Sequence, residues 1–353
     1  MKFLDDIYKK FSNDIGIDLG TANTLVWVRG HGIIIDEPSI VAINKKTGRV
    51  VAVGSEAKKM LGRTPGHIDV IRPLVDGVIS DFEVTEEMLH YLINKAERLS
   101  KRQSKFIRPR VVVGVPSGIT NVETRAVIDA AKSAGVREVY IVEEPMAAAI
   151  GIGLPVNDPV GSMVVDIGGG TSDIAVISLG GIVQSKNLKI AGDHLNRDII
   201  NHIRNEFKIL IGEKTAEDIK IKVSSIVPRE PLEMNIRGRD LITGLPREII
   251  VTDTDVREAL NSSIRILIDS IKEVLERTPP EIVADVMRRG IFLSGGGGLI
   301  HNLDVLINRE LNIPVHVAPD ALSAVARGAG MILEDLELYR GVLLHEYDEL
   351  PPR

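Results

Sequence analysis

The chain contains no cysteine, which excludes disulfide bonds, thiolate metal sites and a cysteine nucleophile. This composition fits a protein of the reducing cytoplasm. Aromatic residues make up only 3% of the 353 residues, so the core must be built from isoleucine, valine, leucine and alanine. No apolar run reaches the ~20 residues that a membrane span needs, and we find no signal-peptide pattern.

Several common signatures of function are also missing. The sequence has no GxxxxGK[ST] P-loop, no GxGxxG fingerprint and no HExxH zinc motif. Ser117 lies in GVPSG, which is not the GxSxG nucleophile elbow, and the eight histidines show no ligand spacing. A net charge of -6 argues against nucleic acid as a main partner. The length is sufficient for two domains with cores of their own.

The most informative stretch is residues 14–28, DIGIDLGTANTLVWV. Two apolar runs, predicted as strands, flank a small-residue turn, and Asp18 stands at the end of the first run. The turn consists of Gly20, Thr21, Ala22 and Asn23. Its backbone N–H groups suit a phosphate, while the carboxylate suits a divalent metal. An ordinary hairpin would show the same pattern.

The same pattern returns in MVVDIGGGTSDIAVISL, where Asp166 takes the place of Asp18 after 148 residues. Such a repeat predicts two related domains. Two further features join it: Glu144 at a strand-to-helix junction, and a glycine run at 295–298 that would let a nucleotide approach the backbone. Two phosphate turns and a metal would clamp a polyphosphate, and a carboxylate there would orient a water for in-line attack.

Hydrophobic periodicity predicts the remaining elements. Helices are expected over 55–61, 84–99, 121–134, 146–150, 195–211, 215–223, 254–277 and 323–333. Strands are expected over 33–35, 40–43, 50–53, 111–115, 139–142 and 291–293, with a small β unit within 224–252. The last helix is rich in small residues and is expected to pack closely.

Two apolar segments have open interpretations. The N-terminal 13 residues place an apolar helical face opposite lysines and aspartates, which suits either a membrane surface or docking on the chain's own body. The members of that face are Phe3, Leu4, Ile7, Tyr8 and Phe11. The second segment is a basic loop, 100–110, with Phe106 and Ile107 at its tip. The alternative interpretation is that Phe106 is a core residue at the start of the next strand.

A set of motifs resembles the superfamily of actin, hexokinase and the heat-shock chaperones, and within it the MreB/Mbl family of bacterial actins. The motifs are IDLGTANT, GVP, EEPMAAAIG, VVDIGGGTSD, IAGD, GEKTAE and LSGGGGLI, in the family's order from about residue 14 to 334. EEPMAAAIG and GEKTAE together are specific to this family, although they do not separate MreB from a close paralogue such as Mbl.

The resemblance implies an α/β, actin-like fold in which two ribonuclease-H-like domains face an ATP cleft, each with a smaller subdomain. The implied divisions are an amphipathic membrane helix at 1–13, subdomain IA at 14–41, 75–153 and 326–353, IB at 42–74, IIA at 154–192 and 254–325, and IIB at 193–253.

It also implies the roles of site residues. Asp18 and Asp166 match the positions that hold magnesium, largely through water, and Glu144 matches the residue that positions the attacking water. Asp166 and Thr171 complete the implied catalytic set. The implied ATP-binding residues are Gly20, Thr21, Ala22, Asn23, Gly168, Gly169, Gly170, Thr171, Glu217, Lys220, Gly295, Gly296, Gly297 and Gly298. Without the resemblance, Glu217 and Lys220 would be a solvated helical pair.

The implied activity is slow ATP hydrolysis coupled to assembly of antiparallel double filaments that organise cell-wall elongation and rod shape. The implied partners are further copies of the chain, anionic lipids of the inner membrane face, RodZ and the elongation machinery. Both apolar segments would then be membrane anchors. Lys101, Arg102, Lys105, Arg108 and Arg110 surround the loop tip and favour anionic lipid at ~1 kcal/mol per charge. Many copies in a filament would make weak attachment firm.

Two other functions share the predicted cleft. A heat-shock chaperone needs a substrate-binding domain after the ATPase, whereas only about twenty residues follow the last predicted helix. A sugar kinase needs an acceptor site with its own base, and phosphate release unchanged by added sugars would argue against it.

Overall fold

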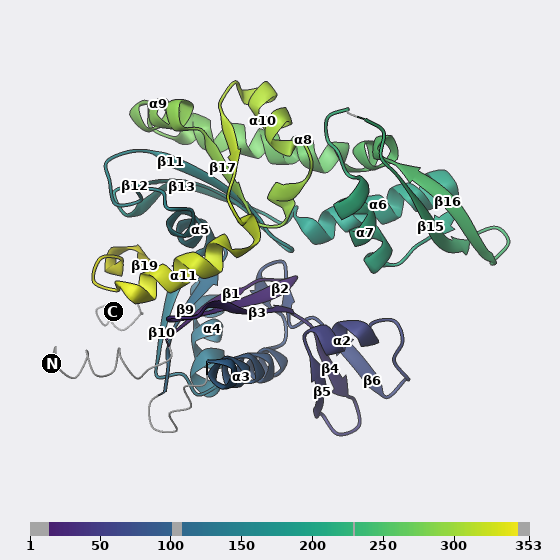
Figure 1. The fold of residues 1–353 in the computed structure, drawn as a ribbon, viewed down its shortest axis with the longest axis horizontal. Helices are drawn as coiled ribbons and strands as arrows, with labels where there is room; N and C mark the ends of the chain where they lie inside the picture. Colours follow the sequence, from purple (N-terminus) through teal and green to yellow (C-terminus); the bar gives the residue numbers. More distant parts are fainter. Residues whose placement is uncertain (1–13, 101–107, 229, 345–353) are drawn as a thin grey trace. The chain divides into compact units, whose positions relative to one another are not determined.

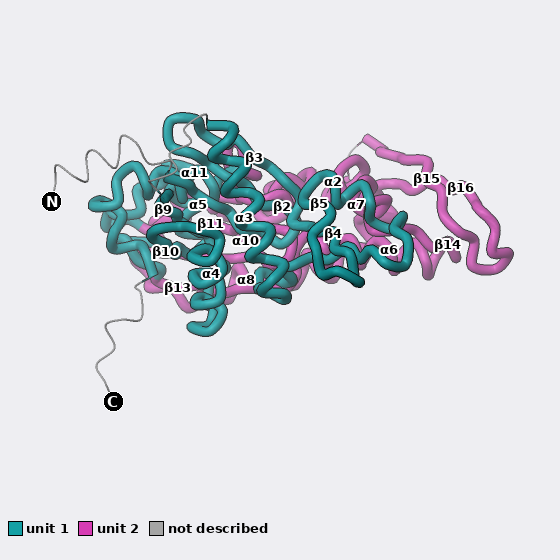
Figure 2. The backbone as a smooth tube through the Cα atoms, turned by 90° about the horizontal axis from the view of Figure 1, so that it is seen from below, with its two compact units in different colours: residues 1–160, 177–182, 323–353 teal, residues 161–176, 183–322 magenta. Residues whose placement is uncertain are grey.

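The computed structural model describes residues 14–100, 108–228 and 230–344. The predicted N-terminal helix with its apolar face, and the loop tip Phe106-Ile107, lie outside these residues. The chain divides into two compact units (Figure 2). Unit 1 contains residues 1–160, 177–182 and 323–353, and unit 2 contains 161–176 and 183–322.

Unit 1 is built on a six-stranded sheet in the order β19-β10-β9-β1-β2-β3. Its strands are β1 (Ile15–Leu19), β2 (Asn23–Val28), β3 (Gly32–Pro38), β9 (Arg110–Val115), β10 (Glu138–Glu143) and β19 (Leu343–Leu344). The central strands β1, β9 and β10 are parallel, while β1 and β2 form the predicted hairpin with Asp18 opposite Leu25. The apolar side chains of one face form a buried core with helices α3 (Phe82–Leu99) and α4 (Asn121–Ser133).

The other face of this sheet carries α5 (Glu144–Ile152) and α11 (Ala324–Glu334) (Figure 1). The two helices touch through glycines, as the small residues of the last helix predicted. A Cβ on Gly328 would lie 1.8 Å from the carbonyl oxygen of Ala147, and one on Gly151 would lie 2.0 Å from that of Ala324. Backbone therefore lies against backbone where these helices meet.

A small lobe, residues 40–71, follows β3 in unit 1 (Figure 1). Its sheet has the order β5-β4-β6 and one short helix. The elements are β4 (Val41–Asn44), β5 (Val50–Val53), α2 (Ser55–Met60) and β6 (Ile68–Ile71), after which β7 (Leu74–Val75) and β8 (Val78–Ile79) form a short hairpin. The lobe's own core is small, with three buried members: Ile40, Ala42 and Ala57.

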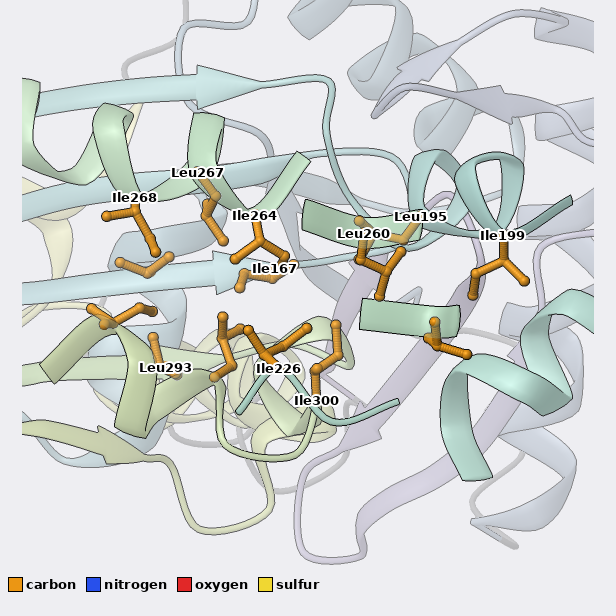
Figure 3. Close-up of a cluster of buried hydrophobic side chains, with 14 of the residues drawn as sticks. Ile167, Leu195, Ile199, Ile226, Leu260, Ile264, Leu267, Ile268, Leu293 and Ile300 are labelled. Atoms are coloured by element: carbon orange, nitrogen blue, oxygen red, sulfur yellow. The ribbon is translucent and has the colours of Figure 1, made fainter. Parts of the chain in front are cut away.

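Unit 2 has a five-stranded sheet in the order β13-β12-β11-β17-β18. Its strands are β11 (Ser162–Ile167), β12 (Ser172–Ser178), β13 (Gly181–Leu188), β17 (Ile291–Ser294) and β18 (Val315–Val317). Helices α6 (Gly192–Phe207), α7 (Glu213–Val223), α8 (Asp253–Arg277), α9 (Pro280–Arg289) and α10 (Leu303–Leu311) accompany it. A second sheet joins β14 (Ile209–Leu210), β15 (Glu233–Asp240) and β16 (Pro246–Thr252). Aliphatic side chains such as Ile167, Leu260 and Leu293 fill the core (Figure 3).

Most predicted elements are confirmed, with two kinds of error. The helix predicted over 195–211 ends at Phe207, because Lys208 adopts a left-handed conformation (φ 56°) and the next two residues pair with β15 as β14. Helices α9 and α10 and strands β6, β13 and β18 were not predicted. Among the described residues, no helix has both the length and the apolarity needed to cross a membrane. The proposed subdomain boundaries stay a prediction.

Candidate functional site

The first turn, residues 20–23, connects β1 to β2 and is held in place by Ser39. The buried Ser39 donates its N–H to the Ala22 carbonyl at 3.0 Å and its hydroxyl to the Gly20 carbonyl at 2.5 Å. Its hydroxyl also lies 2.9 Å from that of Thr24. A Cβ on Gly20 would lie 2.6 Å from the Asn23 carbonyl oxygen, so only glycine permits a turn this tight.

The polar side chains of the first turn have partners in unit 1. Thr21 is buried, and its hydroxyl accepts a hydrogen bond from the Gly77 N–H at 2.9 Å. Asn23 donates its amide to Asp36 at 2.7 Å, between neighbouring strands. The side chains of Thr21 and Asn23 thus stabilise the conformation of the turn. The backbone of the turn is then the part that can face a ligand.

Asp18 and Glu144 lie at the carboxyl ends of neighbouring parallel strands. Asp18 on β1 is in register with Gly114 on β9, and Gly114 is in register with Val142 on β10. Glu144 follows β10 directly as the first residue of α5, with Pro145 next to it. Carboxyl ends of parallel strands are where open α/β sheets bind ligands. A Cβ on Gly114 would lie 2.8 Å from Cγ1 of Val325 and 3.5 Å from Cγ of Glu144, so this glycine lets β9 pack closely against both side chains.

Asp166 is the second-to-last residue of β11 in unit 2 and is buried, with 5% of its surface exposed. Ser294, its register partner on β17, donates a hydroxyl hydrogen bond to the carboxylate. Burial raises the pKa of Asp166 to about 6, because desolvation outweighs the lowering effect of the Ser294 hydrogen bond. A buried carboxylate of this kind gains from a nearby cation, which fits the predicted magnesium role.

The second turn, residues 168–171, is closed by a hydrogen bond from the Gly168 N–H to the Thr171 carbonyl at 2.9 Å. Its own carbonyls bind the start of α6: the Gly192 N–H donates to Gly168 at 3.0 Å, and the Asp193 N–H donates to Gly169 at 2.8 Å. Thr171 is buried. These bonds fix the turn on the N-terminal end of a helix, where anions are favoured.

Lys220 on α7 approaches the second turn through Gly192. Its ammonium group donates to the Gly192 carbonyl at 2.8 Å. Burial lowers the pKa of Lys220, although Glu217 and Asp193 act in the opposite direction. A Cβ on Gly192 would lie 3.3 Å from both the Lys220 nitrogen and the Gly168 carbonyl oxygen. Glu217, Lys220 and the second turn therefore belong to one part of unit 2.

The glycine run 295–298 follows β17, and most of its glycines serve packing. Gly295 has φ +74°, and its Cβ would lie 2.3 Å from the Ile167 carbonyl oxygen. A Cβ on Gly297 would lie 2.1 Å from the Ile167 side chain. Gly297 and Gly298 are buried, whereas Gly296 is exposed. Of the four predicted residues, Gly296 has the backbone most accessible to a ligand.

The predicted residues thus fall into two groups. Unit 1 brings together Asp18, the first turn and the start of α5 with Glu144. Unit 2 brings together Asp166, the second turn and Lys220, with the glycine run next to Asp166 through Ser294. Within the described chain, no group of three or more His, Cys, Asp or Glu side chains is placed to hold a metal by itself. Magnesium typically takes one or two carboxylates and completes its shell with water and phosphate.

Three supporting residues were not predicted as part of the site: Ser39, Gly192 and Ser294. Ser39 acts through contacts made by strand pairing, for which the sequence holds no local signal. Gly192 and Ser294 lie in the quoted motifs IAGD and LSGGGGLI, and those positions would have indicated them.

The predicted contribution of Arg110 to a lipid-facing basic loop is wrong. Arg110 is buried, and its guanidinium binds both oxygens of the buried Asp14, at 2.6 and 3.2 Å. Arg29 binds the same carboxylate at 3.1 Å. Arg110 therefore neutralises a carboxylate inside unit 1. Arg108 is exposed, and the three other basic residues lie outside the described chain.

Comparisons with known proteins agree with these features. A family profile described as MreB/Mbl protein matches residues 12–340. The chain is 52% identical over 328 residues to the cell shape-determining protein Mbl of Bacillus subtilis, covering 93% of this chain and 97% of Mbl. It is 49% identical over 343 residues to the cell shape-determining protein MreB of Escherichia coli, covering 95% and 97%.

Solved structures show the same fold. The ADP-bound MreB5 of Spiroplasma citri matches with a TM-score of 0.87 and 39% identity, covering 92% of this chain and 97% of MreB5. The same protein bound to AMPPNP matches with a TM-score of 0.86, at 39% identity and coverage of 93% and 97%. A MamK double helical filament matches with a TM-score of 0.77 and 25% identity, covering 92% and 99%. With its two glycine turns, paired strand-end aspartates and actin-like fold, this chain belongs to the MreB/Mbl protein family.

Proposed function

We propose that this protein is an ATP-binding bacterial actin that assembles into filaments and organises cell shape. The observation that carries the proposal is the pair of glycine turns, each preceded by a strand-end aspartate and each fixed by hydrogen bonds from its own unit. The names of the relatives support the cell-shape role, and the nucleotides in the MreB5 structures support an adenine nucleotide.

The two turns would bind the phosphates through backbone N–H groups. Within the described residues, the Gly169 and Gly170 N–H groups donate to no backbone carbonyl, so they are suited to phosphate oxygens. Asp18 and Asp166 would hold magnesium, largely through water. The bound metal would neutralise charge on the phosphates. Glu217, Lys220 and Gly296 would contact the nucleoside.

Glu144 would act as the residue that positions the attacking water. Glu144 is buried at the start of α5, with its Cγ next to Gly114 at the carboxyl end of β9. A carboxylate there accepts a hydrogen bond from water and directs a lone pair toward the γ-phosphorus. Thr171 would assist near the same phosphate. Hydrolysis would be slow and coupled to assembly.

We further propose antiparallel double filaments on the inner face of the cytoplasmic membrane. The apolar N-terminal face and Phe106-Ile107 would contact anionic lipid. Arg108 would be a basic neighbour of the loop tip, whereas Arg110 would not. RodZ and the cell-wall elongation machinery are proposed partners through the family alone. Attachment by many weakly binding copies along a filament would be strong.

The function is tested by sedimentation and electron microscopy with ATP, magnesium and anionic liposomes, together with phosphate release. We expect filaments on the liposomes with ATP, and monomers without nucleotide. Glu144→Ala should bind ATP with nearly unchanged affinity yet release phosphate about a hundredfold more slowly, the lower end of the range for a side chain that acts as a general base. Monomers under all conditions would refute the filament role, and unchanged phosphate release would refute the role of Glu144. Insensitivity to added sugars would separate this function from that of a kinase.

A further inference from the structure

Glu37 lies near the end of β3, just before the chain enters the small lobe. Both of its carboxylate oxygens are occupied by other parts of unit 1. One oxygen accepts hydrogen bonds from the N–H and the hydroxyl of Ser55, each at 2.7 Å, at the start of α2. The other accepts a hydrogen bond from the Lys95 ammonium on α3 at 2.5 Å. One side chain therefore bridges the small lobe and the main body of the unit.

The packing around Glu37 is tight. Gly54, the residue before Ser55, has φ +68°, and a Cβ on it would lie 2.3 Å from the bridging carboxylate oxygen. The backbone conformation thus favours glycine at this position, and a side chain here would displace the Glu37 carboxylate. The first turn of α2 lies directly on the carboxylate, which holds the helix in one place.

The bridge has the features of an ion pair that contributes to structure. The Glu37 side chain is only 13% exposed and that of Lys95 32%, whereas the ion pair of Glu56 and Lys59 on α2 is about 70% exposed on both sides. Burial raises the pKa of Glu37, but the hydrogen bonds from Lys95 and Ser55 outweigh it and the net pKa is lowered. The carboxylate therefore stays ionised at neutral pH. Partly buried, charge-assisted hydrogen bonds are stronger than solvated pairs.

Apolar contacts also attach the small lobe to the main body, and these are less directional. Val41 and Val53 join the main core of unit 1, but aliphatic contacts tolerate small sliding and rotation. A carboxylate that accepts hydrogen bonds from three donors in fixed positions does not tolerate such sliding or rotation. Among these contacts, the Glu37 bridge is the one that specifies the orientation of the lobe on α3.

The same strand segment also holds the first turn. Glu37 is in register with Thr24 on β2, immediately after the turn. Two residues further on, Ser39 binds the carbonyls of Gly20 and Ala22. Residues 37–39 therefore contact the turn through Ser39 and the lobe through Glu37, within a stretch too short to move in independent parts.

We propose that Glu37 is a positioning residue that orients the small lobe on α3 and couples it to the first turn. Occupancy of the turn then changes the mobility of the lobe through residues 37–39. The coupling half of this inference rests on the proposed nucleotide function, whereas the orienting half does not.

The test is amide hydrogen exchange on the full-length protein, without nucleotide and with the ATP analogue AMPPNP and magnesium. Without nucleotide, Glu37→Gln should raise exchange in α2 and the lobe sheet at least tenfold and leave β9 and β10 unchanged. Lys95→Met should act in the same direction, and Lys95→Arg, which keeps a charged donor, should retain most of the protection. Glu56→Gln, which removes an exposed carboxylate from the same helix, is the matched control and should change nothing.

The measurements with AMPPNP distinguish the orienting role of Glu37 from its coupling role. In the wild-type protein, AMPPNP should slow exchange both in residues 18–24 and in the small lobe. In Glu37→Gln it should still protect residues 18–24 but no longer change the lobe. Wild-type exchange in the lobe of both Glu37→Gln and Lys95→Met would overturn the orienting role. A lobe that still responds to AMPPNP in Glu37→Gln would overturn the coupling, and no protection of residues 18–24 in the wild type would contradict the proposed nucleotide function instead.

Discussion

Asp166 is a buried carboxylate at the end of a central strand, where Ser294 supplies a single hydroxyl hydrogen bond. The folded protein favours the protonated form of this group, since its pKa is raised to about 6. In the unfolded chain the same group ionises near its ordinary value of about 4. As pH rises from about 4 through 6, ionisation favours the unfolded chain and the folded state loses stability.

We therefore predict that Asp166→Asn stabilises the protein when nucleotide and magnesium are absent. The gain in the free energy of unfolding should be up to about 3 kcal/mol at pH 7.5 and roughly 1 kcal/mol at pH 4.5. Asparagine keeps an acceptor for the Ser294 hydroxyl and carries no charge. Urea unfolding in EDTA at the two pH values measures the difference. Equal or lower stability of the variant at pH 7.5 would contradict this account.

The packing of helices α5 and α11 depends on glycines at their contact. Each presents a glycine to the other helix's backbone, and α11 also lies on β1, where a Cβ on Gly16 would be 2.8 Å from the Gly330 nitrogen. Because α5 begins with Glu144, its packing on α11 helps to place the Glu144 carboxylate. The element that orients Glu144 is thus itself oriented by small residues about 180 positions away in the sequence.

Gly328→Ala tests this packing. Alanine normally favours a helix over glycine by about 1 kcal/mol. Here the added Cβ would lie 1.8 Å from the Ala147 carbonyl oxygen, and neither backbone can move aside alone. We expect a net loss of about 3 kcal/mol or more in the free energy of unfolding, measured in urea.

Gly341→Ala is the matched control for that variant. Its Cβ would meet no atom within 4 Å, and its φ is not in the left-handed region. Its stability should stay within about 0.5 kcal/mol of the wild type. A Gly328→Ala protein as stable as this control would show that α5 and α11 can separate without cost.

The proposed nucleotide-binding residues belong to both units. Under the proposal, unit 1 would contribute Asp18, the first turn and Glu144, and unit 2 would contribute Asp166, the second turn and Lys220. A ligand that engages both should raise the unfolding temperature of the entire protein, because it binds the folded chain alone. Saturation at a hundred times the dissociation constant corresponds to about 2.7 kcal/mol.

We predict that magnesium and AMPPNP together raise the melting temperature by several degrees in differential scanning calorimetry. Asp18→Asn in unit 1 and Asp166→Asn in unit 2 should each remove most of that shift, because each deletes one of the two carboxylates proposed to hold the metal. A variant of one unit that retains the full wild-type shift would exclude its aspartate from ligand binding. The shift obtained with AMPPNP in EDTA isolates the metal contribution.

Local sequence determined a large part of this protein. Alternating apolar residues specified the hairpin of β1 and β2, small residues specified its turn, and the repeat of that pattern indicated a second unit. Glu144 and Pro145 marked the start of α5, since proline suits the first turn of a helix and not its interior. These features depend on neighbours within a few residues, so the sequence alone determines them.

Tertiary structure decided what depends on distant partners. The charge of Arg110 suggested a lipid-facing loop, but strand pairing places it on the buried Asp14. The pattern of residues 195–211 predicted one continuous helix. In the structure the helix ends at Phe207, and the next residues pair with β15 as strand β14. Ser39, Ser294 and Glu37 acquire their roles only because strands and helices bring them to a turn, a carboxylate and a lobe. A side chain's hydrogen-bond partner is chosen by the packing of the whole unit, and no local pattern in the sequence encodes that choice.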